Sequence, residues 1–267
     1  MPVPLLPLGW EQVGARVRRA SGVALFVDFD GTLSPLVIDP RTARVDAASR
    51  GALARLAGNP RARVCVISGR GREDLRARIG LPGLHYLGVH GADAGGTSPG
   101  GREFAPELRR RIEEARQELA ARLNGTAGVF LEDKGISFAL HYRGARGDAV
   151  ERASDLLDGI VARSEGRLHV LNGDCVWEVL PAENRGKGHA AWKQWRAWGL
   201  DALPVYIGND ATDEAAFHTL ASGITVRVGA ARASKARYSL RNTAEVRWFL
   251  MQLEKEMKWK MLPGSNS

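Results

Sequence analysis

A short, wholly apolar run at residues 23–27 constrains the fold more than any other feature of the sequence. A strand with one face in solvent alternates apolar and polar residues, whereas this run does not alternate. An uninterrupted apolar run is typical of a parallel strand that is covered on both faces. Parallel strands are joined by long crossovers, which are usually helices. The run therefore favours an α/β fold.

The same rhythm of strand and helix recurs on both sides of the middle of the chain. Further short apolar runs predict strands at residues 63–67, 85–89, 204–207 and 224–228. Helical patterns fall between or after them, at residues 46–57, 72–79, 213–221 and 244–256. Strands and helices in this order form an open parallel sheet with right-handed crossovers. We therefore predict a Rossmann-like α/β core.

The middle of the chain has a different order of elements. A glycine-rich stretch at residues 91–101 is typical of a linker or hinge. Beyond it, the pattern predicts helix, strand, strand, helix, strand and strand, at residues 107–123, 128–131, 136–142, 148–163, 168–171 and 176–180. This αββαββ order predicts an inserted α+β cap domain. The expected division is a core at 1–100 and 183–267, and an inserted cap at 101–182.

Composition narrows the protein class. The hydrophobic fraction of 44% and the charged fraction of 25% are ordinary for a globular domain, and no apolar run is long enough to cross a bilayer. Residues 1–20 lack the order of a signal peptide, so we expect a cytoplasmic protein. Cys65 and Cys175 lie among apolar neighbours and resemble small core residues more than zinc ligands or a disulfide pair.

The net charge of +8 raises the question of a nucleic-acid partner. The excess is mostly arginine scattered among alanine, glycine and leucine, which is more typical of solvated helix faces than of a recognition surface. A small anionic substrate needs only a local positive pocket. We therefore expect neither a nucleic-acid nor a membrane partner.

Two carboxylates follow the first predicted strand, in the segment Asp28-Phe29-Asp30-Gly31-Thr32. Ligands of open α/β sheets bind at the carboxyl ends of the strands. Alternate strand residues project to the same side, which sets Asp28 and Asp30 near one another. A polar turn could contain the same residues by chance, so a functional interpretation of this segment needs support from elsewhere in the chain.

Three further polar segments give that support. Ser68-Gly69-Arg70 ends the second strand and offers a hydroxyl and backbone amides to phosphate oxygens. Lys187 stands between two glycines at a helix start, and residues 208–214 gather oxygen ligands after a later strand. Taken singly, these are a helix cap, a surface lysine and a polar turn. Oxygen ligands without histidine or cysteine suit Mg²⁺, so together they predict a site for Mg²⁺ and phosphate.

At these residues the chain resembles the haloacid dehalogenase-like phosphatases, and more closely the trehalose-6-phosphate phosphatase family. The resemblance covers nearly the whole chain, from about residue 23 to residue 250. Its matches are residues 28–35, 68–70, His90-Gly91, Glu132-Asp133-Lys134, His141-Tyr142-Arg143, Glu178 with Pro181 before Lys187-Gly188, residues 209–214 with Phe217, and residues 236–240.

The resemblance implies a role for each matching residue. Asp28 is expected to be the nucleophile and Asp30 the general acid and then base, with Ser68 and Lys187 holding phosphoryl oxygens. Mg²⁺ is expected on Asp28, the Asp30 backbone carbonyl, Asn209 and Asp210. The implied substrate contacts are Thr32, Gly69, Arg70, His90, Glu132, Lys134, His141, Arg143 and Glu178. The resemblance further implies a small sugar phosphate as substrate and functional coupling to a trehalose-phosphate synthase.

Some residues depart from the family pattern and leave alternatives open. Asn209 stands where the family usually has aspartate, which should weaken metal binding. Asp174 and Leu180 replace basic residues that are common in the cap, which leaves the sugar open. The alternatives are a phosphatase for sucrose 6-phosphate or mannosyl-3-phosphoglycerate, and a non-catalytic regulator that binds a sugar phosphate. The intact Asp28, Asp30, Ser68 and Lys187 argue against the regulator.

Overall fold

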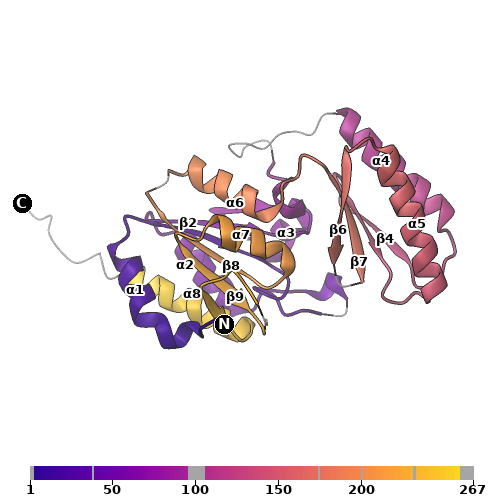
Figure 1. Cartoon of the computed structure of the whole chain (residues 1–267). Coiled ribbons are helices and arrows are strands. Elements are labelled where there is room, and N and C mark those ends of the chain that lie inside the picture. The colour runs from indigo at the N-terminus through magenta and orange to yellow at the C-terminus, as the bar shows by residue number, and fades with distance from the viewer. Residues whose placement is uncertain are drawn as a thin grey trace, which may run out of the picture. The chain divides into compact units, whose positions relative to one another are not determined.

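The chain forms two compact units, residues 1–100 with 186–267 (unit 1) and residues 101–185 (unit 2). The computed structural model describes residues 3–37, 39–95, 106–173, 175–199, 201–230 and 233–258. The predicted linker at 91–101 therefore lies outside the described residues from position 96 onward, as does Asp174. Figure 1 shows the course of the chain through both units.

Unit 1 is built on a six-stranded sheet with the order β10-β9-β8-β1-β2-β3. All of its neighbouring strands are parallel, and every residue of the central strand β1 is buried. The α/β parallel-sheet core predicted from the sequence is thus confirmed. The strands are β1 Val23–Val27, β2 Ala62–Ile67, β3 Leu84–Leu87, β8 Leu203–Gly208, β9 Ile224–Val228 and β10 Tyr238–Leu240.

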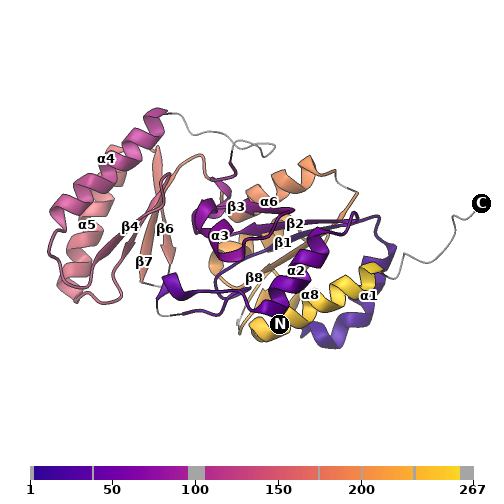
Figure 2. The same ribbon diagram turned by 180° about the vertical axis from the view of Figure 1, so that it is seen from behind.

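Helices cover both faces of this sheet because alternate strand residues point to opposite sides. Leu25 belongs to the core shared with α1, α2, α3 and α8, whereas Phe26 belongs to the core shared with α6 and α7. Figure 1 shows α6 and α7 on the near face, and Figure 2 shows α2 and α8 on the far one. The helices are α1 Trp10–Arg19, α2 Ala47–Ala57, α3 Arg72–Ile79, α6 Gly186–Ala197, α7 Glu214–Thr219 and α8 Thr243–Lys258. Short 3₁₀ helices are η1 Leu6–Gly9, η2 Pro40–Thr42, η3 Val89–Gly91 and η4 Ala211–Asp213.

Three local features differ from the sequence-based expectation. The strand expected at 85–89 ends at Leu87, because Val89 and His90 have φ values of 47° and 53° and turn the backbone into η3. The helix expected at 213–221 is shorter, running from Glu214 to Thr219 after η4. Helix α1 and strand β10 were not predicted as elements.

Unit 2 is a four-stranded antiparallel sheet, order β4-β5-β7-β6, with two long helices. Its elements are α4 Pro106–Arg122, β4 Phe130–Asp133, β5 Phe138–His141, α5 Gly147–Arg163, β6 Leu168–Gly173 and β7 Val176–Pro181. Phe138, Leu140 and Val179 pack with Leu119 and Leu157 of the helices. The observed order of these elements matches the predicted αββαββ order.

The strand register places the polar residues of unit 2 on the other face of its sheet. Glu132 pairs with Ala139, and Ala139 pairs with Glu178, so these three side chains share one face. His141 lies two residues beyond Ala139 and points the same way. One face of the sheet thus builds the core, and the opposite face carries ionisable groups. In the described part of the chain, no helix has the length and apolarity that a membrane span requires.

Candidate active site

Asp28 begins the candidate site at the carboxyl end of β1. Its backbone N–H donates to Ile207 O at 2.9 Å, which extends the β1–β8 ladder by one residue. Because β1 lies between β2 and β8, the segments that follow all three strands meet at one edge of the sheet. Ser68 follows β2, and Asn209 follows β8. The sheet therefore brings three of the predicted motifs together.

Lys187, in the first turn of α6, supplies a buried cation at this edge. Its Nζ donates to Asp28 Oδ1 at 2.8 Å and to Asp213 Oδ1 at 3.0 Å, and lies 3.7 Å from Asp210 Oδ1. Burial alone would lower the pKa of Lys187, but the three carboxylates raise it well above its ordinary value. Lys187 is therefore charged and holds the nucleophile candidate in place. Burial raises the pKa of Asp28, against the opposing effect of Lys187.

Asp213 organises the site, although it was not among the predicted site residues. Its carboxylate accepts hydrogen bonds from Tyr206 Oη at 2.8 Å and from the backbone N–H groups of Asn209 and Asp210 at 2.8 and 3.0 Å. Asp210 in turn caps η4 by accepting from the backbone N–H of Asp213. The three-residue spacing of the two aspartates was the available signal, since it is the spacing of a capping box. A side chain at Gly208 would overlap Asp213.

The Asn209 side chain meets two other oxygens of the site. One terminal atom of its amide lies 3.1 Å from Asp28 Oδ2 and 2.8 Å from the Asp30 carbonyl oxygen. Thr32 Oγ1 lies 3.3 Å from the same atom. A nitrogen at that position donates to both Asp28 Oδ2 and the Asp30 carbonyl, whereas an oxygen there would face two acceptors unless a cation lay between them. Gly31, with a φ of 77°, leaves room for the amide, because a Cβ at this position would overlap it.

These residues fit a small divalent cation. Mg²⁺ binds oxygen at about 2.0–2.1 Å in an octahedron, so adjacent ligands lie about 3 Å apart. The Asn209 amide atom lies at that spacing from Asp28 Oδ2 and from the Asp30 carbonyl oxygen, so the three groups could share a cation with the amide oxygen turned toward it. Among the described residues, no three His, Cys, Asp or Glu side chains are arranged to hold a metal, so a cation here would also need backbone or amide oxygens. Around Lys187, three carboxylates face one ammonium, and this excess of negative charge also favours a cation.

Ser68 lies beside this group, in a segment held by hydrogen bonds from η3. The side chain of Ser68 is buried, and its Oγ accepts from the Arg70 backbone N–H at 3.3 Å. The backbone N–H of His90 donates to Ser68 O, and that of Val89 donates to Arg70 O, both at 2.8 Å. The left-handed backbone at Val89 and His90 is an uncommon conformation for such residues, and it makes this pairing possible. Gly69 lies within the segment.

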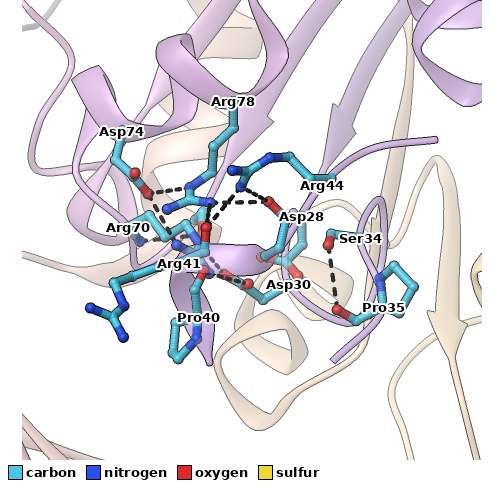
Figure 3. Close-up of polar contacts among 12 residues, drawn as sticks. Asp28, Asp30, Ser34, Pro35, Pro40, Arg41, Arg44, Arg70, Asp74 and Arg78 are labelled. Carbon is cyan, nitrogen blue, oxygen red and sulfur yellow. Dashed lines mark hydrogen bonds and ion pairs between the residues drawn. The ribbon is translucent and has the colours of Figure 1, made fainter. Parts of the chain in front are cut away.

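Arg70 contacts Asp30 directly (Figure 3). Its Nε donates to Asp30 Oδ2 and its Nη2 to Asp30 Oδ1, both at 2.7 Å. Its Nη1 donates to Asp74 Oδ2 at 3.0 Å. Burial would lower the pKa of Arg70, but the hydrogen bonds from its guanidinium to Asp30 and Asp74 raise it. Arg70 was predicted as a substrate contact, and the structure brings it onto a predicted catalytic carboxylate.

In unit 2, an ion pair and a hydrogen bond join four of the predicted substrate contacts. Lys134 Nζ lies 2.9 Å from Glu178 Oε1, and both side chains are 11% exposed. His141 Nε2 lies 3.0 Å from Glu132 Oε2, and this hydrogen bond lowers the pKa of Glu132 despite its burial. Arg143, the remaining predicted contact in this unit, follows β5 and is exposed.

Comparison with known proteins gives the family. The trehalose-phosphatase family profile matches residues 26–244. A probable trehalose-phosphate phosphatase 4 of Oryza sativa subsp. japonica is 31% identical over an alignment of 271 positions that covers 97% of this chain and 72% of the rice protein. A trehalose-phosphate phosphatase of Mycobacterium marinum is 34% identical over 88% of this chain, and the chain spans 62% of that relative.

A solved structure agrees with the fold. The C-terminal domain of the C. albicans trehalose-6-phosphate phosphatase superposes with a TM-score of 0.75, covering 95% of this chain and 98% of that domain. Its sequence identity of 21% supports a shared fold and no more. The family match spans Asp28, Ser68, Lys187 and Asp213, the residues that meet at the edge of the unit 1 sheet. The chain belongs to the trehalose-phosphatase family.

Proposed function

We propose that this protein hydrolyses trehalose 6-phosphate to trehalose and phosphate, with Mg²⁺ as cofactor and an aspartyl-phosphate intermediate on Asp28. The observation that carries the proposal is the buried contact of Asp28 with Lys187, 2.8 Å long, at the carboxyl end of β1. A carboxylate that serves as a nucleophile must be held in one orientation, and Lys187 restrains one of its two oxygens. The choice of trehalose 6-phosphate as substrate is based on family membership.

The first step transfers the phosphoryl group to Asp28. The carboxylate attacks phosphorus, and the bond between phosphorus and the sugar oxygen breaks in line with the attack. Asp30 donates a proton to the departing sugar oxygen, which otherwise would leave as an unstable alkoxide. Lys187 and the Ser68 hydroxyl hold phosphoryl oxygens while charge redistributes between them.

The second step returns the enzyme to its starting state. Asp30, now a carboxylate, takes a proton from a water molecule as that water attacks phosphorus. The bond between phosphorus and the Asp28 oxygen then breaks and phosphate leaves. The same residue thus serves as acid in one step and base in the next. Its carboxyl group must therefore gain and lose a proton while its side chain stays in one position.

The oxygen ligands described above define the proposed metal site. Asp28, the Asp30 carbonyl, Asn209 and Asp210 would hold Mg²⁺, which when bound offsets the repulsion between the nucleophile and the phosphate dianion. Thr32 Oγ1 lies 3.3 Å from the Asn209 amide and lines the same site. A neutral amide contributes less charge than a carboxylate, so we expect this protein to need more Mg²⁺ than a variant with aspartate at the same position.

We assign recognition of the sugar to unit 2. Glu132, Lys134 and Glu178 offer carboxylates and an ammonium, which match the donors and acceptors of sugar hydroxyls. The names of the relatives favour trehalose 6-phosphate, and a synthase that makes this ester would supply the substrate. Sucrose 6-phosphate and mannosyl-3-phosphoglycerate remain the alternative substrates, because Leu180 is buried and offers no charge to a sugar.

Phosphate release from a panel of esters tests the proposal. The panel is trehalose 6-phosphate, sucrose 6-phosphate, mannosyl-3-phosphoglycerate and glucose 6-phosphate, each with Mg²⁺ and with EDTA. We expect release that depends on Mg²⁺ and a kcat/KM highest for trehalose 6-phosphate. A higher kcat/KM for another ester would reassign the substrate. Binding of the esters without any release would instead support the non-catalytic regulator.

A further inference from the structure

The contact between Arg70 and Asp30 has the geometry of a planar, two-point clamp. Two nitrogens of the guanidinium donate to the two carboxylate oxygens, each at 2.7 Å. This fork matches a carboxylate in direction as well as charge, which a lysine ammonium does not achieve. The Arg70 side chain is 11% exposed, against 35% for Asp30. The arginine is therefore the buried and fixed member of the pair.

Arg70 is itself held by groups outside the reaction. Nη1 donates to Asp74 Oδ2 at 3.0 Å, Nη2 also donates to Pro40 O at 2.9 Å, and the guanidinium lies over the Phe29 ring with Cζ 5.3 Å from its centroid. Figure 3 shows this network around Asp30. Each nitrogen of the guanidinium has a protein partner. This occupancy favours a supporting role for Arg70 over a direct contact with the substrate phosphate.

Asp74 is fixed in turn by a second arginine. Arg78 Nε donates to Asp74 Oδ2 at 2.8 Å, and Arg78 Nη1 donates to Arg41 O and Ala43 O, both at 3.0 Å. Helix α3 supplies Asp74 and Arg78 one turn apart. The chain of contacts therefore runs from the helix to Asp30 through Arg70, and it also ties down the loop around η2.

We propose that Arg70 is a positioning residue for Asp30 and that Asp74 holds the Arg70 guanidinium in place. The inference rests on the acid–base role proposed above for Asp30. Arg70 uses one acceptor direction of each Asp30 oxygen and leaves the other direction available for a proton. The clamp thus fixes the carboxylate while leaving it able to exchange a proton with the leaving group and with water.

This role predicts a dependence on the leaving group. A sugar or alkyl oxygen needs a proton as it departs, whereas 4-nitrophenolate is stable without one. A misplaced Asp30 should therefore slow the hydrolysis of alkyl phosphates and spare 4-nitrophenyl phosphate. A lost phosphate contact or a disturbed fold would slow both alike. The parameter to compare is kcat/KM, which reports the first phosphoryl transfer.

The experiment measures kcat/KM for a series of alkyl and aryl phosphates that carry no sugar, with saturating Mg²⁺. General acid catalysis is worth about 10²–10⁴-fold, so a partly misplaced acid should lose a fraction of that. For Arg70→Lys, we expect a loss of about tenfold or more on alkyl phosphates and less than about threefold on 4-nitrophenyl phosphate. Asp74→Asn should show the same pattern with a smaller loss. Arg41→Gln is the matched control, because this exposed side chain pairs with Asp39, and it should leave the series unchanged.

Four results would overturn the inference. Equal losses on alkyl and aryl phosphates would make Arg70 a phosphate contact or a structural residue. Faster turnover of alkyl phosphates in Arg70→Lys would mean that Arg70 holds Asp30 away from its productive position. Asp30→Asn serves as the reference: if it too showed no dependence on the leaving group, the proposed role of Asp30 would fail along with the inference. If Asp30→Asn depended on the leaving group but the Arg70 and Asp74 variants did not, the inference would be refuted and the proposed role of Asp30 would stand. If Arg70→Lys does not fold, the Asp74→Asn variant alone tests the inference.

Discussion

Lys187 Nζ lies 2.8 Å from Asp28 Oδ1, and both side chains are almost completely buried. The same ammonium also contacts the buried Asp213 at 3.0 Å. Charges removed from water are tolerated only when they are paired and hydrogen-bonded. The contact therefore serves the fold as well as the proposed reaction, and the two roles can be separated by substitution.

Replacing Lys187 should cost stability. Lys187→Met leaves the Asp28 and Asp213 carboxylates buried without their cation, and breaking such a pair typically costs about 3–5 kcal/mol. We expect the free energy of unfolding, measured by urea denaturation in EDTA, to fall by about that amount. Lys235→Met, at an exposed position, is the control and should change little. Equal stability of the two variants would mean that the carboxylates are satisfied without Lys187.

Asp28→Asn should abolish turnover, because an amide is a poor nucleophile. The substitution keeps the size of the side chain and can still accept a hydrogen bond from Lys187, so we expect a folded protein. The measurement is phosphate release, with circular dichroism as the check on folding. Substantial activity in a pure Asp28→Asn sample would exclude the aspartyl-phosphate mechanism.

Asn209→Asp should lower the Mg²⁺ concentration at half-saturation. The new carboxylate adds one negative charge beside Asp28 Oδ2 and the Asp30 carbonyl, which now lie 3.1 and 2.8 Å from the amide. Calorimetric titration with Mg²⁺ reports the affinity independently of turnover. An unchanged titration would place the metal on Asp210 or elsewhere.

Asp74 gives a prediction for the pH dependence of stability. Burial would raise its pKa, but hydrogen bonds from Arg78 and Arg70 lower it below the ordinary 3.8. A carboxyl whose pKa is lower in the folded state contributes stability above its unfolded pKa and loses it as pH falls through the folded value. The stability gap between wild type and Asp74→Asn should therefore be constant near neutral pH and shrink below about pH 4. A gap that stays constant at lower pH would mean that the charge of Asp74 does not stabilise the fold.

The sequence predicted those parts of the site that depend on strand ends. The run at 23–27 coincides with β1, so Asp28 could be placed at a strand end from its pattern alone. Lys187 could be assigned to a helix start, but its two partners come from segments 159 and 26 residues away. Such contacts depend on the order of strands in the sheet, which the local pattern does not encode.

The contact of Arg70 with Asp30 likewise could not be predicted from a local sequence pattern. Arg70 follows β2, and a hydroxyl and amides at a helix start suggested phosphate binding. The pairing depends on β2 lying beside β1 and on Asp74, one turn into α3, holding the guanidinium from behind. Similarly, the positive φ values at Val89 and His90 occur together with the hydrogen bonds of η3 to residues 68–70, and they have no signature in the residue types.

The last prediction concerns the choice of sugar. In the proposed mechanism the residues of unit 1 around Asp28 bind only phosphate and metal, so they would not distinguish one sugar ester from another. Lys134 and Glu178 are the strongest candidates for that choice, because they form an ion pair of 2.9 Å on the sheet face that carries the ionisable groups of unit 2. A surface salt bridge of no functional importance would have the same geometry, so substrates must separate the two interpretations.

A buried hydrogen bond to a sugar, lost on truncation, costs about 1–3 kcal/mol, which corresponds to about tenfold to a hundredfold in rate. We therefore expect Lys134→Ala and Glu178→Ala each to lower kcat/KM for trehalose 6-phosphate by at least about tenfold. Hydrolysis of 4-nitrophenyl phosphate, which has no sugar to hold, should change by less than about threefold. Glu151→Ala, at an exposed position on α5 of the same unit, is the control and should spare both substrates. Equal losses on the sugar phosphate and the aryl phosphate would assign Lys134 and Glu178 to the structure of unit 2, and the specificity role would be wrong.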